Sequence, residues 1–107
     1  MINLRLRENE EKYHDMEVFK MVAKNLKFYR LHHRNKKYFG KNLSQINAAE
    51  EMGISRSMLS GIESDNYYVE FSLSIVNRAS VVYNIPLHYF FMKESPIFDD
   101  RDTKETS

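Results

Sequence analysis

Hydrophobic residues recur every three or four positions over two long stretches of the chain, which is the spacing of helices that bury one face. The first stretch predicts a helix over about residues 17–34, whose apolar face consists of Val18, Phe19, Val22, Ala23, Leu26 and Tyr29. The second predicts a helix over residues 73–83, whose inward face consists of Leu73, Val76, Ala79, Ser80 and Tyr83. Ser72 can cap this helix, Asn84 can end it in the left-handed conformation, and Pro86 can begin a short helix over residues 86–91.

Between these stretches, residues 43–66 (LSQINAAEEMGISRSMLSGIESDN) predict two short helices around a tight turn. The first covers residues 43–52, and Ser55 is placed to cap the second, which ends near residue 63. A small residue allows the helices to pack closely, a glycine can adopt the positive φ that ends the first helix, and two apolar residues three apart share the inward face of the second. These residues are Ala49, Gly53, Leu59 and Ile62. The pattern predicts a helix-turn-helix, whose second helix is shaped for a DNA major groove.

The two ends of the chain lack this periodicity. Residues 1–12 alternate Ile2, Leu4 and Leu6 with polar residues. This strand-like pattern fits a flexible arm, a strand added to a partner, or an unstructured leader. The last segment is polar, and we expect it to be disordered. The predicted organisation is an N-terminal arm over residues 1–14, a helix-turn-helix domain over 15–93 and a polar tail over 94–107.

The predicted fold class is all-α, a compact five-helix bundle with a central helix-turn-helix and flexible ends. A chain of 107 residues, 42% of them hydrophobic, suits one domain with a buried core. There is no cysteine, which excludes disulfides and thiolate chemistry. No apolar run reaches the ~18 residues of a membrane span, and the first residues lack the apolar core of a signal peptide. We therefore expect a soluble, cytoplasmic protein.

The net charge of +1 conceals an uneven distribution of charge. Residues 18–49 carry eight Lys or Arg residues and no Asp or Glu, whereas residues 50–107 carry ten acids and five bases. A basic run can simply be a solvated helix face. Beside a predicted helix-turn-helix, however, it favours a polyanionic partner. The eight bases are Lys20, Lys24, Lys27, Arg30, Arg34, Lys36, Lys37 and Lys41.

The chain resembles the phage Cro/repressor (Xre) family of helix-turn-helix regulators over about residues 22–91. The matching residues are LSQ at 43–45, Ala49, MGIS at 52–55, SRS at 55–57 and IE at 62–63, followed by Ser72-Leu73 and IPLHYFF at 85–91. The resemblance implies a sequence-specific regulator of transcription that binds double-stranded DNA. It further implies a repressor that binds a palindromic operator as a dimer, with two recognition helices about 34 Å apart.

The recognition helix, residues 55–63, carries the candidates for reading bases. Arg is the best single reader of guanine, so Arg56 is the first candidate, and pairing with a phosphate or with Glu63 is the alternative. Met58 can contact a thymine methyl or pack against the fold, and we favour packing. The predicted base-contacting residues are Arg56, Ser57, Ser60 and Gly61, the last by close backbone approach or through water.

A helix N-terminus offers free N–H groups to a phosphate, which points to the start of the first helix of the motif. Ser44 can act there as an N-cap, as a phosphate ligand, or as both. The predicted phosphate-contacting residues are Ser44, Gln45, Lys36, Lys37, Lys41, Asn66 and Tyr67.

Three consecutive aromatic residues suggest a dimer interface, since a small monomer cannot easily bury all of them. They are Tyr89, Phe90 and Phe91; alternatively, two of the three complete the core. A second interpretation of the whole chain is an antitoxin or other protein-interaction module on the same fold, whose main partner is a protein. The four histidines and the carboxylates form no metal-ligand or catalytic pattern, so we expect no enzyme, metal or cofactor.

Overall fold

The computed structural model describes the backbone of residues 4–32, 41–66 and 68–94, and the side chains of these ranges from residue 14 onward. Within these ranges, four α-helices and one 3-10 helix follow one another. They are α1 (Leu4–His32), α2 (Gln45–Met52), α3 (Arg56–Glu63), α4 (Leu73–Tyr83) and the 3-10 helix η2 (Leu87–Phe91). The predicted all-α class is confirmed, and the fifth helical segment is a single 3-10 stretch rather than an α-helix.

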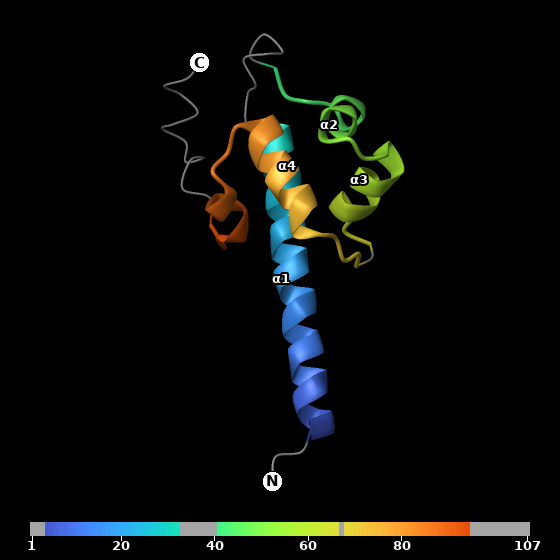
Figure 1. The fold of residues 1–107 in the computed structure, drawn as a ribbon, viewed down its shortest axis with the longest axis vertical. Helices are drawn as coiled ribbons and strands as arrows, with labels where there is room; N and C mark the ends of the chain where they lie inside the picture. The colour runs from blue at the N-terminus through green and yellow to red at the C-terminus, as the bar shows by residue number, and fades with distance from the viewer. Residues whose placement is uncertain (1–3, 33–40, 67, 95–107) are drawn as a thin grey trace.

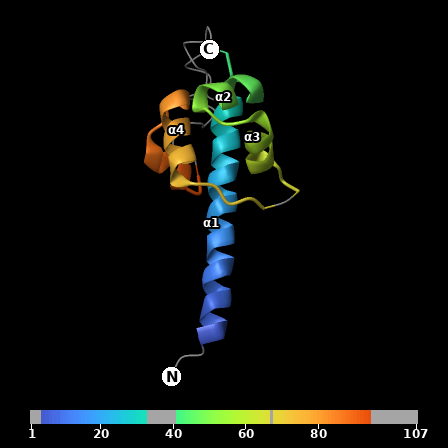
Figure 2. The same ribbon diagram turned by 45° about the vertical axis from the view of Figure 1, so that its right-hand side comes forward.

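Helix α1 is the axis around which the other elements gather (Figure 1). Its C-terminal half contacts α3, α4 and η2, and α2 packs on α3 and α4. The N-terminal half continues beyond the other helices, and α3 and α4 lie on different sides of α1 (Figures 1 and 2). The helix-turn-helix is therefore held against one end of a long helix.

The strand-like prediction for residues 1–12 is wrong over residues 4–12, which belong to α1. The helix therefore begins at Leu4 and not near residue 17. The physical reason is that Leu, Arg, Glu and Lys dominate this segment and are strong helix formers. Three alternating apolar positions are too few to outweigh that preference. The division of the chain into arm, domain and tail otherwise stays a prediction, and residues 95–107 lie outside the described part.

The core lies where α1 meets the other elements, and its largest fully buried side chains are Tyr29, Tyr83, Phe90, Leu26, Leu59 and Ile85. The Tyr29 and Phe90 rings meet edge to face, with centroids 5.3 Å apart. The predicted stripe of α1 is confirmed at Val22, Leu26 and Tyr29, but Val18 is exposed.

The predicted inward face of α4 is confirmed at Val76, Ala79 and Tyr83 and wrong at Leu73, whose side chain is 62% exposed. Ile75 is buried in its place. Leu73 lies on the outer face of α4 together with the exposed Asn77 and Val81, at a spacing of four residues, so its exposure follows from the helical period.

Local bonds at the helix ends explain why the chain turns where it does. The Ser44 hydroxyl accepts a hydrogen bond from the Asn47 N–H at 3.1 Å, and the Ser55 hydroxyl accepts one from the Met58 N–H at 3.0 Å. Gly53 has φ 72° and ends α2 in the left-handed conformation, which a residue without a Cβ adopts at little cost. The predicted caps and turn of the helix-turn-helix are confirmed.

Candidate nucleic-acid interface

Helix α3 presents one exposed face and one buried face. Leu59 and Ile62 are buried against the core, as predicted. Arg56, Ser57 and Ser60 are all exposed, and their positions i, i+1 and i+4 place them on the same side of the helix. Met58 is also exposed, in contrast to the packing role that we favoured. A guanidinium beside two short hydroxyl side chains leaves a surface that a DNA groove can approach.

Gly61, the fourth predicted base-contacting residue, is buried. It follows Ser60 by about 100° around the helix, toward the side that packs on the rest of the protein. The structure thus does not bring Gly61 onto the exposed face with Arg56. A glycine allows another molecule or another part of the protein to come close to its backbone. At Gly61, it is the protein's own interior that lies close to the helix.

The C-terminal end of α3 is anchored by a buried ion pair that sequence reasoning missed. Arg30 of α1 donates from Nε to Oε2 of Glu63 at 2.7 Å and from Nη2 to Oε1 at 2.6 Å. Arg30 Nη1 also donates to the Leu43 carbonyl at 3.0 Å. The hydrogen bond with Glu63 raises the pKa of Arg30, so the guanidinium stays charged inside the fold.

The Arg30–Glu63 pair excludes two roles that the sequence allowed for these residues. Both oxygens of Glu63 are occupied, so Glu63 is not the partner of Arg56. Arg30, counted among the basic run, is buried and does not contribute to an exposed basic face. The sequence signal was available: Arg30 continues the buried stripe from Leu26 at a spacing of four, and Glu63 stands four after Leu59. Opposite charges on two inward faces indicate a buried pair.

The N-terminus of α2 lies beside this anchor. Gln45 Nε2 donates to Glu63 Oε1 at 3.0 Å, so its side chain is held by the protein itself. The first bond along α2 runs from the Ala48 N–H to the Ser44 carbonyl at 2.9 Å, and Asn47 N–H is taken by the Ser44 hydroxyl. The backbone N–H groups of Gln45 and Ile46 precede these bonds and point from the helix end, where the helix dipole favours an anion.

A hollow of about 410 Å³ lies between α1, the start of α2 and the end of α3. It brings together three of the predicted contact residues, Gln45, Ser60 and Asn66. The half-buried Lys27 also lines it and pairs with Asp65 at 3.7 Å. Ser44 and Lys41 are exposed nearby in the sequence. The predicted contacts Lys36, Lys37 and Tyr67 lie outside the described residues.

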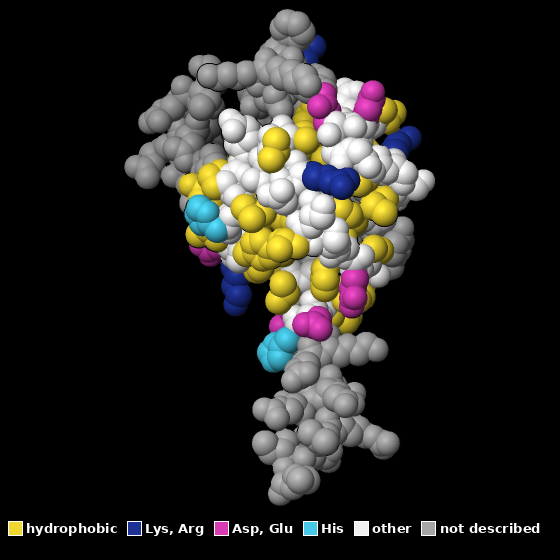
Figure 3. Space-filling model, viewed as in Figure 1, with side chains coloured by type: hydrophobic (Ala, Val, Ile, Leu, Met, Phe, Trp, Pro, Cys, Tyr) yellow, Lys and Arg dark blue, Asp and Glu magenta, His cyan; other side chains and the backbone are white. Residues whose placement is uncertain are grey.

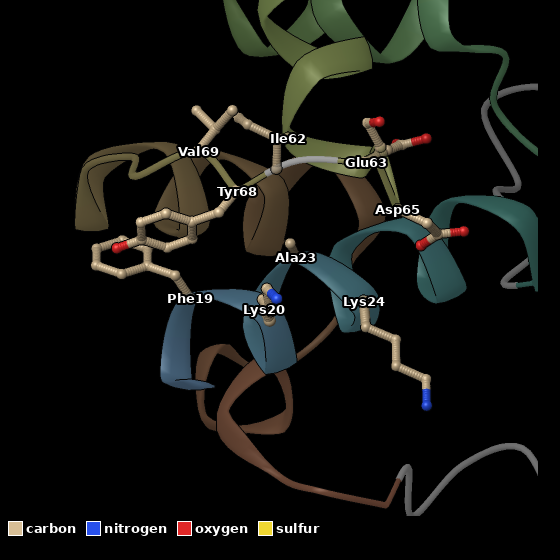
Figure 4. A pocket seen from close by; sticks show the side chains of 10 residues that line it. Phe19, Lys20, Ala23, Lys24, Ile62, Glu63, Asp65, Tyr68 and Val69 are labelled. Atoms are coloured by element: carbon tan, nitrogen blue, oxygen red, sulfur yellow. The ribbon is translucent and has the colours of Figure 1, made fainter. Parts of the chain in front are cut away.

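A second hollow, of about 280 Å³, lies between α1 and the segment that follows α3 (Figure 4). Phe19 and Tyr68 meet edge to face at one end of it, and Lys24 extends away from them (Figure 4). None of the residues predicted to contact DNA is among its lining residues. This hollow is therefore separate from the surface around Arg56.

The three consecutive aromatic residues do not act together. Phe90 is fully buried, which overturns its assignment to a dimer interface. Tyr89 is half-buried against the core, and Phe91 is exposed. Asn25 fixes this segment, because its side-chain amide donates to the carbonyls of Phe90 at 2.7 Å and Met92 at 2.8 Å. A buried Asn in the apolar stripe of α1 was the only sequence signal for that contact.

Comparison with known proteins adds one positive finding. Residues 40–90 match the family model described as "Helix-turn-helix", which covers α2, α3, α4 and most of η2. No curated protein and no solved structure matches the chain. Among the described residues, no cluster of His, Cys, Asp or Glu could hold a metal ion, and no helix is long and apolar enough to cross a membrane.

Proposed function

We propose that α3 reads a specific operator sequence, since residues 40–90 form a helix-turn-helix DNA-binding domain of the Cro/repressor (Xre) type. The protein then acts as a transcriptional repressor that binds a palindromic operator as a dimer. The single observation that carries the proposal is the exposed face of Arg56, Ser57 and Ser60 on a helix whose opposite side is locked into the core.

The proposed contacts divide into two kinds. Arg56 donates to the O6 and N7 atoms of a guanine, while the serines make shorter contacts to base edges or to water. The free N–H groups at the start of α2 hold a phosphate on one side of the groove, and Lys27, Lys41 and Asn66 contact phosphates around it. The buried Arg30–Glu63 pair supports both, because it joins the start of α2 to the end of α3 through Gln45.

The test is the sequence dependence of Arg56. The preferred DNA sequence is first selected from a random pool, and the affinity is then measured for that sequence and for random DNA at one salt concentration. We expect Arg56→Ala to weaken binding to the selected sequence by about 1–3 kcal/mol, with a smaller loss on random DNA. Arg56→Lys should recover only part of the loss, because an ammonium lacks the bidentate fork.

Lys93→Ala provides the control, since Lys93 is an exposed cation that follows η2 and stands outside the helix-turn-helix. It should leave both affinities unchanged. Equal losses on the selected and random sequences for Arg56→Ala would identify a phosphate contact and contradict base readout by this residue. Failure to select any sequence would contradict the proposal as a whole.

A further inference from the structure

The outer face of α4 carries large apolar side chains that the fold does not use. Leu73 is 62% exposed and Val81 is 74% exposed, although both belong to a helix whose other side is buried. Together with Asn77 they stand at i, i+4 and i+8, so they form one ridge along the helix. Figure 3 looks onto this side of the molecule and shows hydrophobic and uncharged side chains over much of it, with basic atoms near the middle of the face.

The three ridge residues, Leu73, Asn77 and Val81, carry no charge. Its exposed neighbours on α4 are Ser74 and Arg78, and the Arg78 guanidinium donates from Nη1 to the Met52 carbonyl at 3.2 Å, at the end of α2. The one basic group of α4 is therefore directed toward α2 and away from the ridge. A neutral ridge can meet an identical ridge without the repulsion that a charged surface would bring.

We propose that two copies of this chain pair through α4, with the two helices antiparallel and the two-fold axis passing beside Asn77. Asn77 is four residues from both Leu73 and Val81. In this arrangement Leu73 therefore meets the other copy's Val81, and Asn77 meets its own equivalent. This is the self-complementary contact that a two-fold interface requires. Ridges at i±4n pack well against each other in helix pairs.

Asn77 gives the pairing its register. A side-chain amide is both donor and acceptor, so two amides related by a two-fold axis can bond to each other reciprocally. Any shift along the helix would bring the amide against Leu73 or Val81 and leave it without a partner, which disfavours the shifted pairing.

This inference rests on the proposed function and deepens it, because a dimer on a palindromic operator must leave α3 uncovered. Helices α3 and α4 lie on different sides of α1 (Figure 2), so a second copy on the outer face of α4 does not cover α3. The two-fold axis of an antiparallel helix pair lies in the interface plane, perpendicular to α4. It can therefore point toward the side of the molecule that carries α3. The same axis keeps both recognition helices on one side of the dimer, where a single DNA duplex can meet them.

The experiment measures dimer dissociation of the full chain by analytical ultracentrifugation over a concentration series without DNA. Leu73→Glu and Val81→Lys should each weaken the dimer about tenfold or more, since each places a charge against an apolar side chain. The double variant, Leu73→Glu with Val81→Lys, should recover most of the affinity. In the antiparallel register, the carboxylate introduced in each copy meets the ammonium introduced in the other. Circular dichroism checks that all variants remain folded, which the exposure of both positions favours.

Ile46→Lys and Phe91→Ser are the matched controls, since both replace an exposed apolar residue elsewhere on the surface. Neither should change the dissociation constant. A monomeric parent protein at every concentration overturns the proposal, as does a dimer that only Phe91→Ser weakens, which would place the interface at η2. Loss in both single variants without recovery in the double variant overturns the antiparallel register. A dimer with these properties that selects no DNA sequence would instead refute the proposed function and leave the interface standing.

Discussion

Two ion pairs join α1 to the end of α3 and to the turn that follows it, and they differ in burial, distance and geometry. Arg30 and Glu63 meet at 2.6 Å with side chains that are 9% and 2% exposed. Lys27 and Asp65 meet at 3.7 Å with side chains that are 39% and 90% exposed. The cations are one helical turn apart and the carboxylates two residues apart, so position along the chain does not explain the difference.

The difference shows that burial and geometry decide what an ion pair does for a fold. In the buried pair, a planar guanidinium binds both oxygens of one carboxylate, and each group depends on the other because neither can reach water. In the exposed pair, water and salt screen a single long contact, and either group can be hydrated if the other is lost. Only the buried pair fixes α3 relative to α1 and α2.

The largest effect is therefore expected from Glu63→Gln, which leaves the Arg30 charge buried without its counter-ion. We expect the free energy of unfolding to fall by about 3–5 kcal/mol, as measured by urea denaturation. This is a large part of the total stability of a small domain. A loss below about 1 kcal/mol would show that water reaches Arg30 in solution and that the pair is not buried there.

The double variant Arg30→Met with Glu63→Leu sharpens the comparison. It removes both charges and fills the space with apolar side chains of similar size, so we expect it to be far more stable than Glu63→Gln. Equal destabilisation of the two variants would mean that the loss comes from packing or from the bond to the Leu43 carbonyl. In that case the uncompensated charge would not be its cause.

An intermediate effect of opposite sign is expected at Tyr83, which is buried close to the Arg30–Glu63 pair. Its hydroxyl has no hydrogen-bond partner among the described residues. Removing an unsatisfied buried hydroxyl avoids its desolvation penalty, so Tyr83→Phe should raise the free energy of unfolding by about 1 kcal/mol. Destabilisation by this variant would indicate a bonded hydroxyl.

Tyr83 also predicts a dependence on pH. Burial raises its pKa above the ordinary value of 10.0, so the folded protein holds this proton more tightly than the unfolded chain. Its contribution to stability is fully present below the unfolded pKa and is lost as pH rises toward the folded one. Comparing urea denaturation at neutral pH and at about pH 10.5, we expect the parent to lose more stability than Tyr83→Phe. Equal losses would contradict the raised pKa.

The smallest effect is expected from Asp65→Asn, which removes the exposed pair. The free energy of unfolding should change by less than about 0.5 kcal/mol, because the median exposed ion pair contributes little. Measurement at low and high salt separates the remaining charge effect from any change in the turn. A loss comparable to that of Glu63→Gln would abolish the distinction between the two pairs.

The sequence predicted the fold best where the cause is local. Ser44, Gly53, Ser55 and Asn84 each act within a few residues of their own position, through a cap or a left-handed backbone, and each lies where the pattern put it. The inward position predicted for Leu73 was wrong because the helical period places this residue on the outer face of α4, with Asn77 and Val81, and an apolar residue type alone does not place a side chain inward. The predicted start of α1 was wrong because the helix propensity of residues 4–12 outweighs an alternation of only three apolar residues.

The candidate site divides in the same way. The exposure of Arg56, Ser57 and Ser60 follows from the helix period, and the structure agrees with it. The Arg30–Glu63 contact joins residues 33 positions apart, and nothing in a linear pattern gives their distance. Gly61 and Phe90 are buried in the fold. Their residue types alone suggested exposed roles, in base contact and in a dimer interface.

Asn25 also has a consequence for the order in which the chain assembles. Its two bonds reach carbonyls 65 and 67 residues away, whereas α2 and α3 can pair across a turn of a few residues. Closing so long a loop loses more chain entropy than closing a short one, so this contact is expected to form late in folding. By the same reasoning η2 should be the first element to detach in partial unfolding. Amide hydrogen exchange should then be faster in η2 than in the helix-turn-helix.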